Sequence, residues 1–268
     1  MSTLLVKLLL APSFVVAASL AARRFGPAVG GLVGGLPVVA GPILLAYALD
    51  HGAHFAARAA VGTLLGLVSL TAFVVVYAAL AGRWPWPACL ATGWAAFLAA
   101  TAVLSALPAA AVPALLLACA SFALAYRFLP VPDAPAAGPP PAPPAWDLPA
   151  RAAAALALVL VLTASARSLG SHLAGLLAPF PIIASILAAF THAQWGADAC
   201  RRLLRGMELG FFAFALFCFT VAVAVEPLGV AAGFLLATAA AVATQAVAVT
   251  ATHRRGRREA AAVSASAR

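Results

Sequence analysis

The sequence predicts an all-α polytopic membrane protein, and three observations carry this prediction. Of the 268 residues, 65% are hydrophobic and only 9% are charged, whereas a typical soluble domain is about 45–50% apolar and about 25% charged. The mean hydropathy is +1.07. The apolar residues form long segments without the alternation of polar and apolar residues that a transmembrane barrel requires. Soluble enzymes, nucleic-acid-binding proteins and disordered chains are therefore excluded, although the formal net charge is +9.

Nine segments are long and apolar enough to cross a membrane as helices. A hydrocarbon core of about 30 Å requires about 20 mostly apolar residues. The predicted spans are residues 4–22, 27–49, 57–80, 86–106, 109–129, 149–166, 171–191, 206–225 and 228–251. Residues 130–148 are rich in Pro and Ala, which favours an extended, solvated cytoplasmic linker over a ligand for an SH3-like domain. Residues 253–268 form a basic cytoplasmic tail.

The two halves of the chain align without gaps at an offset of 144 residues. The aligned pairs are mostly Gly, Pro and Arg, which chance overlap of Ala/Leu-rich helices does not supply. They include Lys7 with Arg151, Arg23 with Arg167, Gly31 with Gly175, Pro37 with Pro181, Gly52 with Gly196, Gly62 with Gly206 and Gly66 with Gly210. The sequence thus predicts a first four-helix unit in residues 1–108, a connecting helix in 109–129 and a second four-helix unit in 149–252.

The number of spans predicts that the two units have opposite orientations in the membrane. Five spans precede the second unit, and an odd number reverses its direction, which gives a 4+1+4 inverted-topology repeat. Cytoplasmic loops carry the excess of Lys and Arg in membrane proteins. With the N-terminus outside and the C-terminus inside, thirteen of the sixteen Lys and Arg residues lie inside. The basic charge is then explained by anionic lipid, without any nucleic acid.

The second unit resembles the GlpM family of small bacterial inner-membrane proteins. The likeness rests on the runs Ala174-Gly175-Leu176-Leu177-Ala178-Pro179-Phe180-Pro181 and Gly196-Ala197-Asp198-Ala199-Cys200-Arg201. The first unit echoes them through Gly30-Gly31-Leu32 and Leu36-Pro37, but has Gly34 and Gly35 in place of Ala178 and Pro179, and Ala57 in place of Arg201. The resemblance implies a tandem duplication of a four-helix unit in a multi-pass protein of the bacterial inner membrane, with a loose link to envelope and exopolysaccharide metabolism.

Two predicted spans contain helix-breaking residues at equivalent positions of the two units. Gly34, Gly35 and Pro37 interrupt the second span, and Pro179 and Pro181 interrupt the seventh. Proline removes a helical hydrogen bond, and paired broken helices in inverted halves are typical of substrate sites in transporters. The alternative interpretation is that the glycines permit close helix packing and the prolines only kink the helices.

Glu208 is the only acidic residue well within a predicted span, and Arg205 lies one turn before it. An ionisable group in hydrocarbon is costly and usually faces the interior of the bundle. Glu208 is therefore a candidate proton or cation relay or a substrate contact, with Arg205 as a second candidate binding residue. The alternative is an interfacial carboxylate that pairs with Arg205 or Arg201.

No motif indicates a catalytic residue, a metal site or a cofactor. Asp50, His51 and His54 include metal-competent groups, but no fourth ligand accompanies them and the second unit does not repeat them. The four cysteines are dispersed without a CxxC pair, and P-loop, Rossmann, triad and HExxH patterns are absent. The chain is therefore not predicted to be an enzyme.

The architecture favours a secondary transporter or lipid-linked flippase that works by alternating access between two inverted repeats. Its partners would be the lipid bilayer and an unknown small solute or lipid-linked substrate. The alternative is a non-transporting envelope scaffold or assembly protein linked to lipid or exopolysaccharide metabolism. Substrate, coupling ion and oligomeric state are not specified by the sequence.

Overall fold

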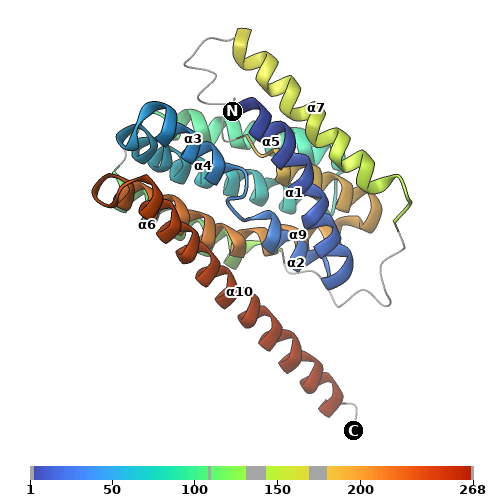
Figure 1. Ribbon diagram of the computed structural model, residues 1–268. Helices are drawn as coiled ribbons and strands as arrows, with labels where there is room; N and C mark the ends of the chain where they lie inside the picture. Colours follow the sequence, from blue (N-terminus) through green and yellow to red (C-terminus); the bar gives the residue numbers. More distant parts are fainter. Residues whose placement is uncertain (1–2, 108–109, 131–142, 169–179, 267–268) are drawn as a thin grey trace.

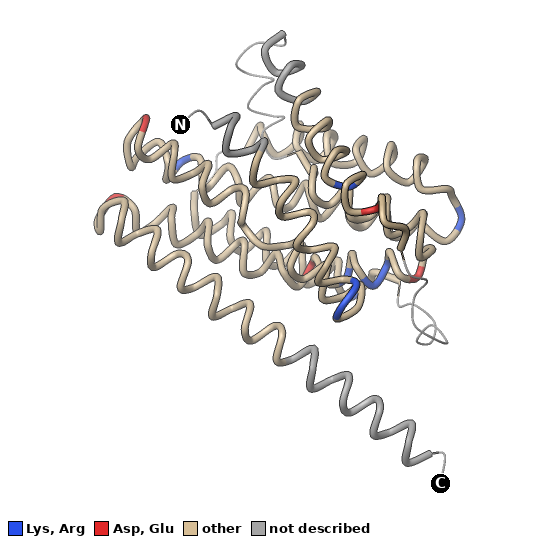
Figure 2. The backbone as a smooth tube through the Cα atoms, turned by 45° about the vertical axis from the view of Figure 1, so that its right-hand side comes forward, with Lys and Arg blue, Asp and Glu red and all other residues tan. Residues whose placement is uncertain are grey.

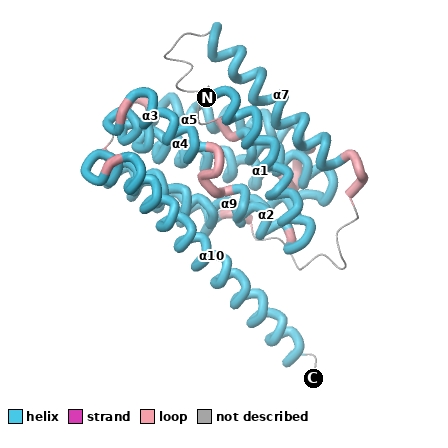
Figure 3. The backbone as a smooth tube through the Cα atoms, viewed as in Figure 1, coloured by secondary structure: helices cyan, strands magenta, loops and turns pink. Residues whose placement is uncertain are grey.

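The chain folds into a bundle of α-helices, as predicted (Figure 1). The computed structural model describes the backbone of residues 3–107, 110–130, 143–168 and 180–266, and the side chains of 9–107, 110–130, 143–161 and 180–250. The helices are α1 (Thr3–Phe25), α2 (Pro27–Gly34), α3 (Ala40–His51), α4 (Ala53–Leu80), α5 (Trp86–Leu104), α6 (Ala111–Phe128), α7 (Asp147–Ser168), α9 (Ile182–Leu228) and α10 (Val230–Ser266). Short loops connect consecutive helices through most of the described part, which contains no strand (Figure 3).

Five helices in the described part of the chain are long and apolar enough to cross a membrane. They are α4, α5, α6, α9 and residues Val230–Thr250 of α10. This supports a multi-pass α-helical membrane protein. Of the other predicted spans, residues 4–22 and 149–166 lie within α1 and α7, and much of 171–191 lies outside the described residues.

The second predicted span is broken, as the sequence indicated. Helix α2 ends at Gly34 and α3 begins at Ala40, so Pro37 lies in the interruption. The side chain of Gln245 on α10 donates a hydrogen bond of 2.9 Å to the carbonyl oxygen of Leu32. A carbonyl at the end of a helix lacks an intrahelical partner, and Gln245 supplies one at this break.

Single glycines mark the boundaries between two pairs of helices. Gly52 separates α3 from α4 with φ 89° and ψ 166°. Gly196 interrupts α9 with φ 80° and ψ 179°, which divides it into residues 182–195 and 197–228. Such positive φ values suit glycine, which has no Cβ. The helix that contains the predicted span 206–225 therefore begins nine residues before that span, because one glycine is enough to redirect the chain and no loop follows it.

Helix boundaries recur at the offset found in the sequence. Helix α4 begins at Ala53 and the second part of α9 at residue 197, and each follows a glycine with positive φ. Likewise, α5 begins at Trp86 and α10 at Val230. The spacing of 144 residues thus applies to the backbone of the described helices as well as to residue identities.

Helix α9 is the central element of the described bundle. It packs against α2, α4, α6 and α10, whereas α7 lies along α1 at the periphery (Figure 1). Backbone meets backbone where α2 crosses α9: a Cβ at Gly206 would clash with the carbonyl oxygen of Ala28, and one at Gly31 would clash with that of Leu203. Larger residues cannot occupy these two positions without moving the helices apart.

Most charged residues of the described chain lie toward the ends of the bundle (Figure 2), whereas Glu208 is buried in its interior. Most of the Lys and Arg positions lie at one end, on the right in Figure 2. We call the end of the bundle where α1 ends with Arg23 and the second part of α9 begins, with Arg201, Arg202 and Arg205, the arginine end. Arg201 donates a 3.2 Å hydrogen bond to the carbonyl oxygen of Ala78 near the end of α4. The clustering agrees in direction with the charge asymmetry of the sequence, while orientation in a cell membrane stays a prediction.

Candidate functional site

The strongest candidate for a functional group is the carboxyl group of Glu208, on α9. Its side chain is completely buried, with a relative exposure of 0%. The helical segment that contains it begins at residue 197, so Glu208 lies about 16 Å along the helix at 1.5 Å per residue. The carboxyl group is therefore well inside the bundle rather than at its edge.

Few polar atoms contact the Glu208 carboxyl group. The hydroxyl of Thr71 on α4 donates a hydrogen bond to Oε2 at 3.3 Å, and Oε1 has no hydrogen-bond partner. Burial without full hydrogen bonding is energetically unfavourable for a carboxyl group. Glu208 is thus held between α4 and α9 with unused bonding capacity.

The arginines that the sequence offered as partners of Glu208 bond elsewhere. Arg205 donates to the carbonyl oxygen of Leu129 at 2.7 Å, and its guanidinium carbon lies 4.4 Å from the centroid of the Tyr126 ring. Arg201 contacts Asp198 at 3.3 Å. The structure therefore does not place Glu208 in an interfacial ion pair with either arginine.

The residues at the predicted breaks lie on a different face of α9. A Cβ at Gly34 would meet the side chains of Leu187 and Met207, and one at Gly35 would meet the backbone of Met207 and Gly210. The structure thus brings Gly34 and Gly35 against α9 but not against the carboxyl group of Glu208, which contacts α4.

The structure describes Pro37 and Pro181, but not Pro179, at the two predicted breaks. Pro37 lies between α2 and α3. Pro181 is buried and immediately precedes α9, whereas Pro179 lies outside the described residues. Helix α9 therefore starts at a proline, as the sequence suggested, but a second break equivalent to the first is not described.

Other polar side chains lie in the interior near α4 and α9. The hydroxyl of Tyr77 lies 3.4 Å from Nδ1 of His192, and Nε1 of Trp94 donates to the hydroxyl of Ser185 at 2.8 Å. Buried hydroxyls without a hydrogen-bond partner belong to Ser69, Thr101 and Thr191. None of these residues is among the candidates drawn from the sequence, and the available signal was a polar residue within an apolar span.

A second buried polar cluster surrounds Asp147 at the start of α7. Asp147 has 0% exposure and accepts hydrogen bonds from Arg23 at 2.5 Å, from Arg151 at 2.9 Å and from Gln194 at 2.5 Å. The Arg151 side chain is only 3% exposed and lies over the Phe190 ring. Because its contacts are charge-assisted or polar, this cluster is suited to joining α1, α7 and α9, and only Nε of Arg23 among its buried polar atoms has no hydrogen-bond partner.

The environment of Asp147 favours its ionised form. Burial by itself raises the pKa of this carboxyl group, but the hydrogen bonds from Arg23, Gln194 and Arg151 lower it, and the resulting pKa is below the ordinary value of 3.8. Asp147 is therefore a charged structural group at neutral pH.

The histidines and cysteines form no metal site in the described residues. No group of three or more His, Cys, Asp or Glu side chains lies close enough there to hold a metal ion. Instead, Nδ1 of His54 lies 3.0 Å from Oε1 of Glu226, and both side chains are exposed. Cys89, Cys119, Cys200 and Cys218 are all free.

No protein-family model, no curated protein and no solved structure matches this chain. The resemblance to the GlpM family therefore stays a prediction from short motifs.

Proposed function

We propose that this chain is a secondary transporter or lipid-linked flippase in which Glu208 is the ion-coupling group. The observation that carries the proposal is the complete burial of Glu208 between α4 and α9, with one carboxyl oxygen unpartnered. Ionisable groups within membrane segments are rare because they are costly, and they usually mark ion or substrate pathways. A single weak partner, Thr71, leaves the carboxyl group free to exchange a proton or bind a cation.

The broken helix beside α9 supports the same proposal. Interrupted helices expose backbone groups that contact substrates in many transporters. The break between α2 and α3 carries a freed carbonyl at Leu32, which Gln245 now occupies. In this proposal, relative movement of α2 and α10 changes that contact while Glu208 changes its protonation.

We further propose that the units are inverted repeats in a 4+1+4 arrangement in a bacterial inner membrane. Support comes from the recurring helix boundaries and from the collection of arginines at one end of the bundle. Two such halves provide the outward-facing and inward-facing states of alternating access.

A scaffold role is the second candidate, and the contact between α2 and α9 favours it. Backbone atoms meet directly at Gly31 and Gly206, and such tight packing resists sliding. This role gives no reason to bury an incompletely bonded carboxyl group. Transport is therefore the better-supported function.

The decisive experiment measures flux into proteoliposomes that contain the full chain. Inorganic phosphate, glucose and fluorescent phosphatidylglycerol serve as probes, each tested with and without imposed proton and sodium gradients. We expect gradient-dependent flux of at least one probe, a loss of about 100-fold in Glu208→Gln, and partial retention in Glu208→Asp. Glu226→Gln, which alters an exposed carboxyl group on the same helix, is the matched control and should leave flux unchanged.

Two results would contradict the proposal. Absence of flux in correctly folded wild-type protein would favour the scaffold. Equal flux in wild type and Glu208→Gln would remove Glu208 from the coupling step.

A further inference from the structure

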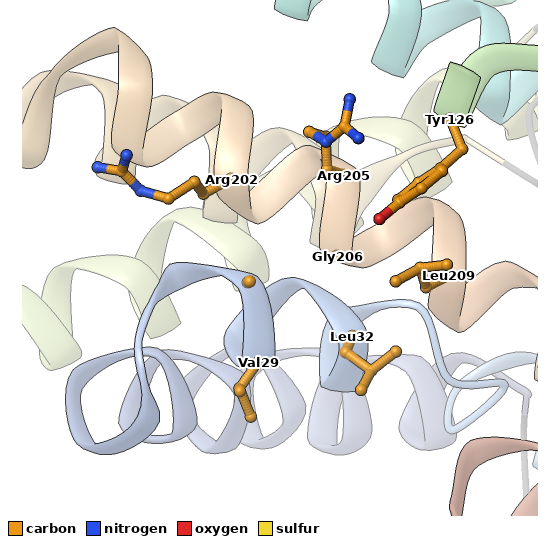
Figure 4. Close-up of a pocket in the computed structure, with 8 residues that line it drawn as sticks. Val29, Leu32, Tyr126, Arg202, Arg205, Gly206 and Leu209 are labelled. Atoms are coloured by element: carbon orange, nitrogen blue, oxygen red, sulfur yellow. The ribbon is translucent and has the colours of Figure 1, made fainter. Parts of the chain in front are cut away.

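A cavity of about 160 Å³ opens between α2, α6 and α9 near the arginine end (Figure 4). This volume is well above the roughly 10–15 Å³ that a cavity needs to hold one water molecule. The lining residues are Ala28, Val29, Leu32, Tyr126, Arg202, Arg205, Gly206 and Leu209. The cavity lies apart from Glu208, so any role for it is independent of the coupling step proposed above.

The two arginines of the cavity have different surroundings. Arg205 is oriented by its bond to the carbonyl oxygen of Leu129 and by stacking on Tyr126, and its other N–H groups remain available. Arg202 has no hydrogen-bond or ion-pair partner among the described residues. In Figure 4 the Arg205 guanidinium lies beside Tyr126, and Arg202 extends along α9.

The carboxylates of the described arginine end are already engaged by other arginines. Asp198 pairs with Arg201, and Asp147 pairs with Arg23 and Arg151. The positive charge of Arg202 and Arg205 is therefore not neutralised by a described carboxylate. An anion would complete the cavity electrostatically.

The shape of the guanidinium group and the cavity walls define the chemistry of that anion. Guanidinium groups bind phosphate oxygens through paired N–H donors. Ala28 lies in the first turn of α2, where the positive end of the helix dipole also favours an anion. Val29, Leu32 and Leu209 supply apolar wall, which a free phosphate does not use.

We propose that this cavity binds a phosphate group, with Arg202, whose guanidinium points away from Arg205 along α9 in Figure 4, turning back to join Arg205 as a ligand. The apolar wall favours phosphate that is carried on a lipid headgroup, so that the adjoining glycerol and acyl carbons cover Leu32 and Leu209. The site would then recognise an anionic phospholipid at the arginine end of the bundle.

The test measures thermal unfolding of the purified full chain in a neutral detergent. Three probes are titrated separately: dihexanoyl phosphatidylglycerol, dihexanoyl phosphatidylcholine and inorganic phosphate. We expect a saturable rise in Tm with phosphatidylglycerol. The apparent Kd should weaken about tenfold or more in Arg202→Gln, as expected for losing a charged hydrogen bond. Arg83→Gln, which alters an exposed arginine outside the cavity, should leave the Kd unchanged.

Each outcome decides the proposal. Saturable binding that depends on Arg202 supports it, with phosphatidylglycerol alone indicating a lipid source and inorganic phosphate indicating a free anion. If Arg205→Gln fails to fold because the bond to Leu129 is lost, Arg202→Gln still tests the site. Equal binding of phosphatidylcholine, equal weakening by Arg83→Gln, or no saturable shift with any probe would overturn it.

Discussion

Helix α4 and the second part of α9 have the same backbone frame and different chemistry. Each starts directly after a glycine with positive φ, at Gly52 and Gly196. At equivalent positions 144 residues apart, α4 has Leu64 and α9 has Glu208, and both side chains are 0% exposed. The frame thus tolerates either an apolar or an ionisable side chain at this buried position.

This difference shows that one set of residues determines the fold and another set supplies the ionisable groups. Glycines and prolines determine where helices stop and how closely they approach. The buried carboxyl and guanidinium groups of the described chain, those of Asp147, Arg151 and Glu208, all lie in the second set of helices. A carboxyl group at position 208 is therefore not demanded by the backbone, which makes a functional reason for it more compelling.

The largest expected effect comes from breaking the buried Asp147 cluster. Asp50 is the comparison residue, because it is an exposed aspartate. Asp147→Ala leaves Arg151, a side chain with 3% exposure, without its carboxylate. Breaking a buried ion pair from one side typically costs about 3–5 kcal/mol, and we expect a loss of that order in the free energy of unfolding. Denaturant unfolding in detergent micelles measures it. Asp50→Ala, the control, should change stability little, and equal losses in both variants would show that the cluster is not distinctive.

The same cluster predicts a dependence on pH. Because the folded pKa of Asp147 lies below its ordinary value of 3.8, its contribution is fully present above that pH and is lost as pH falls through the folded pKa. The difference in Tm between wild type and Asp147→Asn should therefore shrink below about pH 4. A constant difference down to pH 2 would contradict this assignment.

An intermediate effect is expected at the paired positions Gly206 and Gly62. An added Cβ at Gly206 would clash with the carbonyl oxygen of Ala28, whereas one at Gly62 would meet no atom within 4 Å. Gly206→Ala should destabilise the protein by about 1–3 kcal/mol through overpacking. Gly62→Ala should stabilise it by about 0.5–1 kcal/mol, since alanine favours the helix. Thermal unfolding compares them, and a loss at both positions would mean that α4 is packed as closely as α9.

A similarly small effect on stability is expected at Glu208 itself, and like that of Gly62→Ala it is a gain. Glu208→Leu introduces at position 208 the leucine that the first unit has at the equivalent position 64. The substitution also removes an incompletely bonded carboxyl group. We expect stability to rise by about 1 kcal/mol while coupled flux is lost. Glu226→Gln should change neither property. A loss of stability in Glu208→Leu would instead assign Glu208 a structural role through Thr71.

Sequence patterns predicted helix positions better than helix ends. The break at Pro37 follows from the ring of proline and the adjacent glycines, so it was predictable from local chemistry. The start of the helical segment that contains Glu208 was not predictable from the sequence. The polar run from Asp198 to Arg205 has a hydropathy that is typical of a loop. In the structure these residues form the first turns of a helix, since their side chains find partners at the arginine end.

The sequence by itself determined that the chain is helical and apolar enough for a membrane, that its pattern recurs after 144 residues, and that one helix breaks near Pro37. These properties depend on local composition and backbone chemistry. Only the tertiary structure decided that Glu208 contacts Thr71 rather than Arg205, that Asp147 gathers two arginines, and that Arg202 and Arg205 line a cavity. Those outcomes depend on which faces of helices distant in the sequence pack against each other. The local sequence pattern does not specify how one helix is rotated against another.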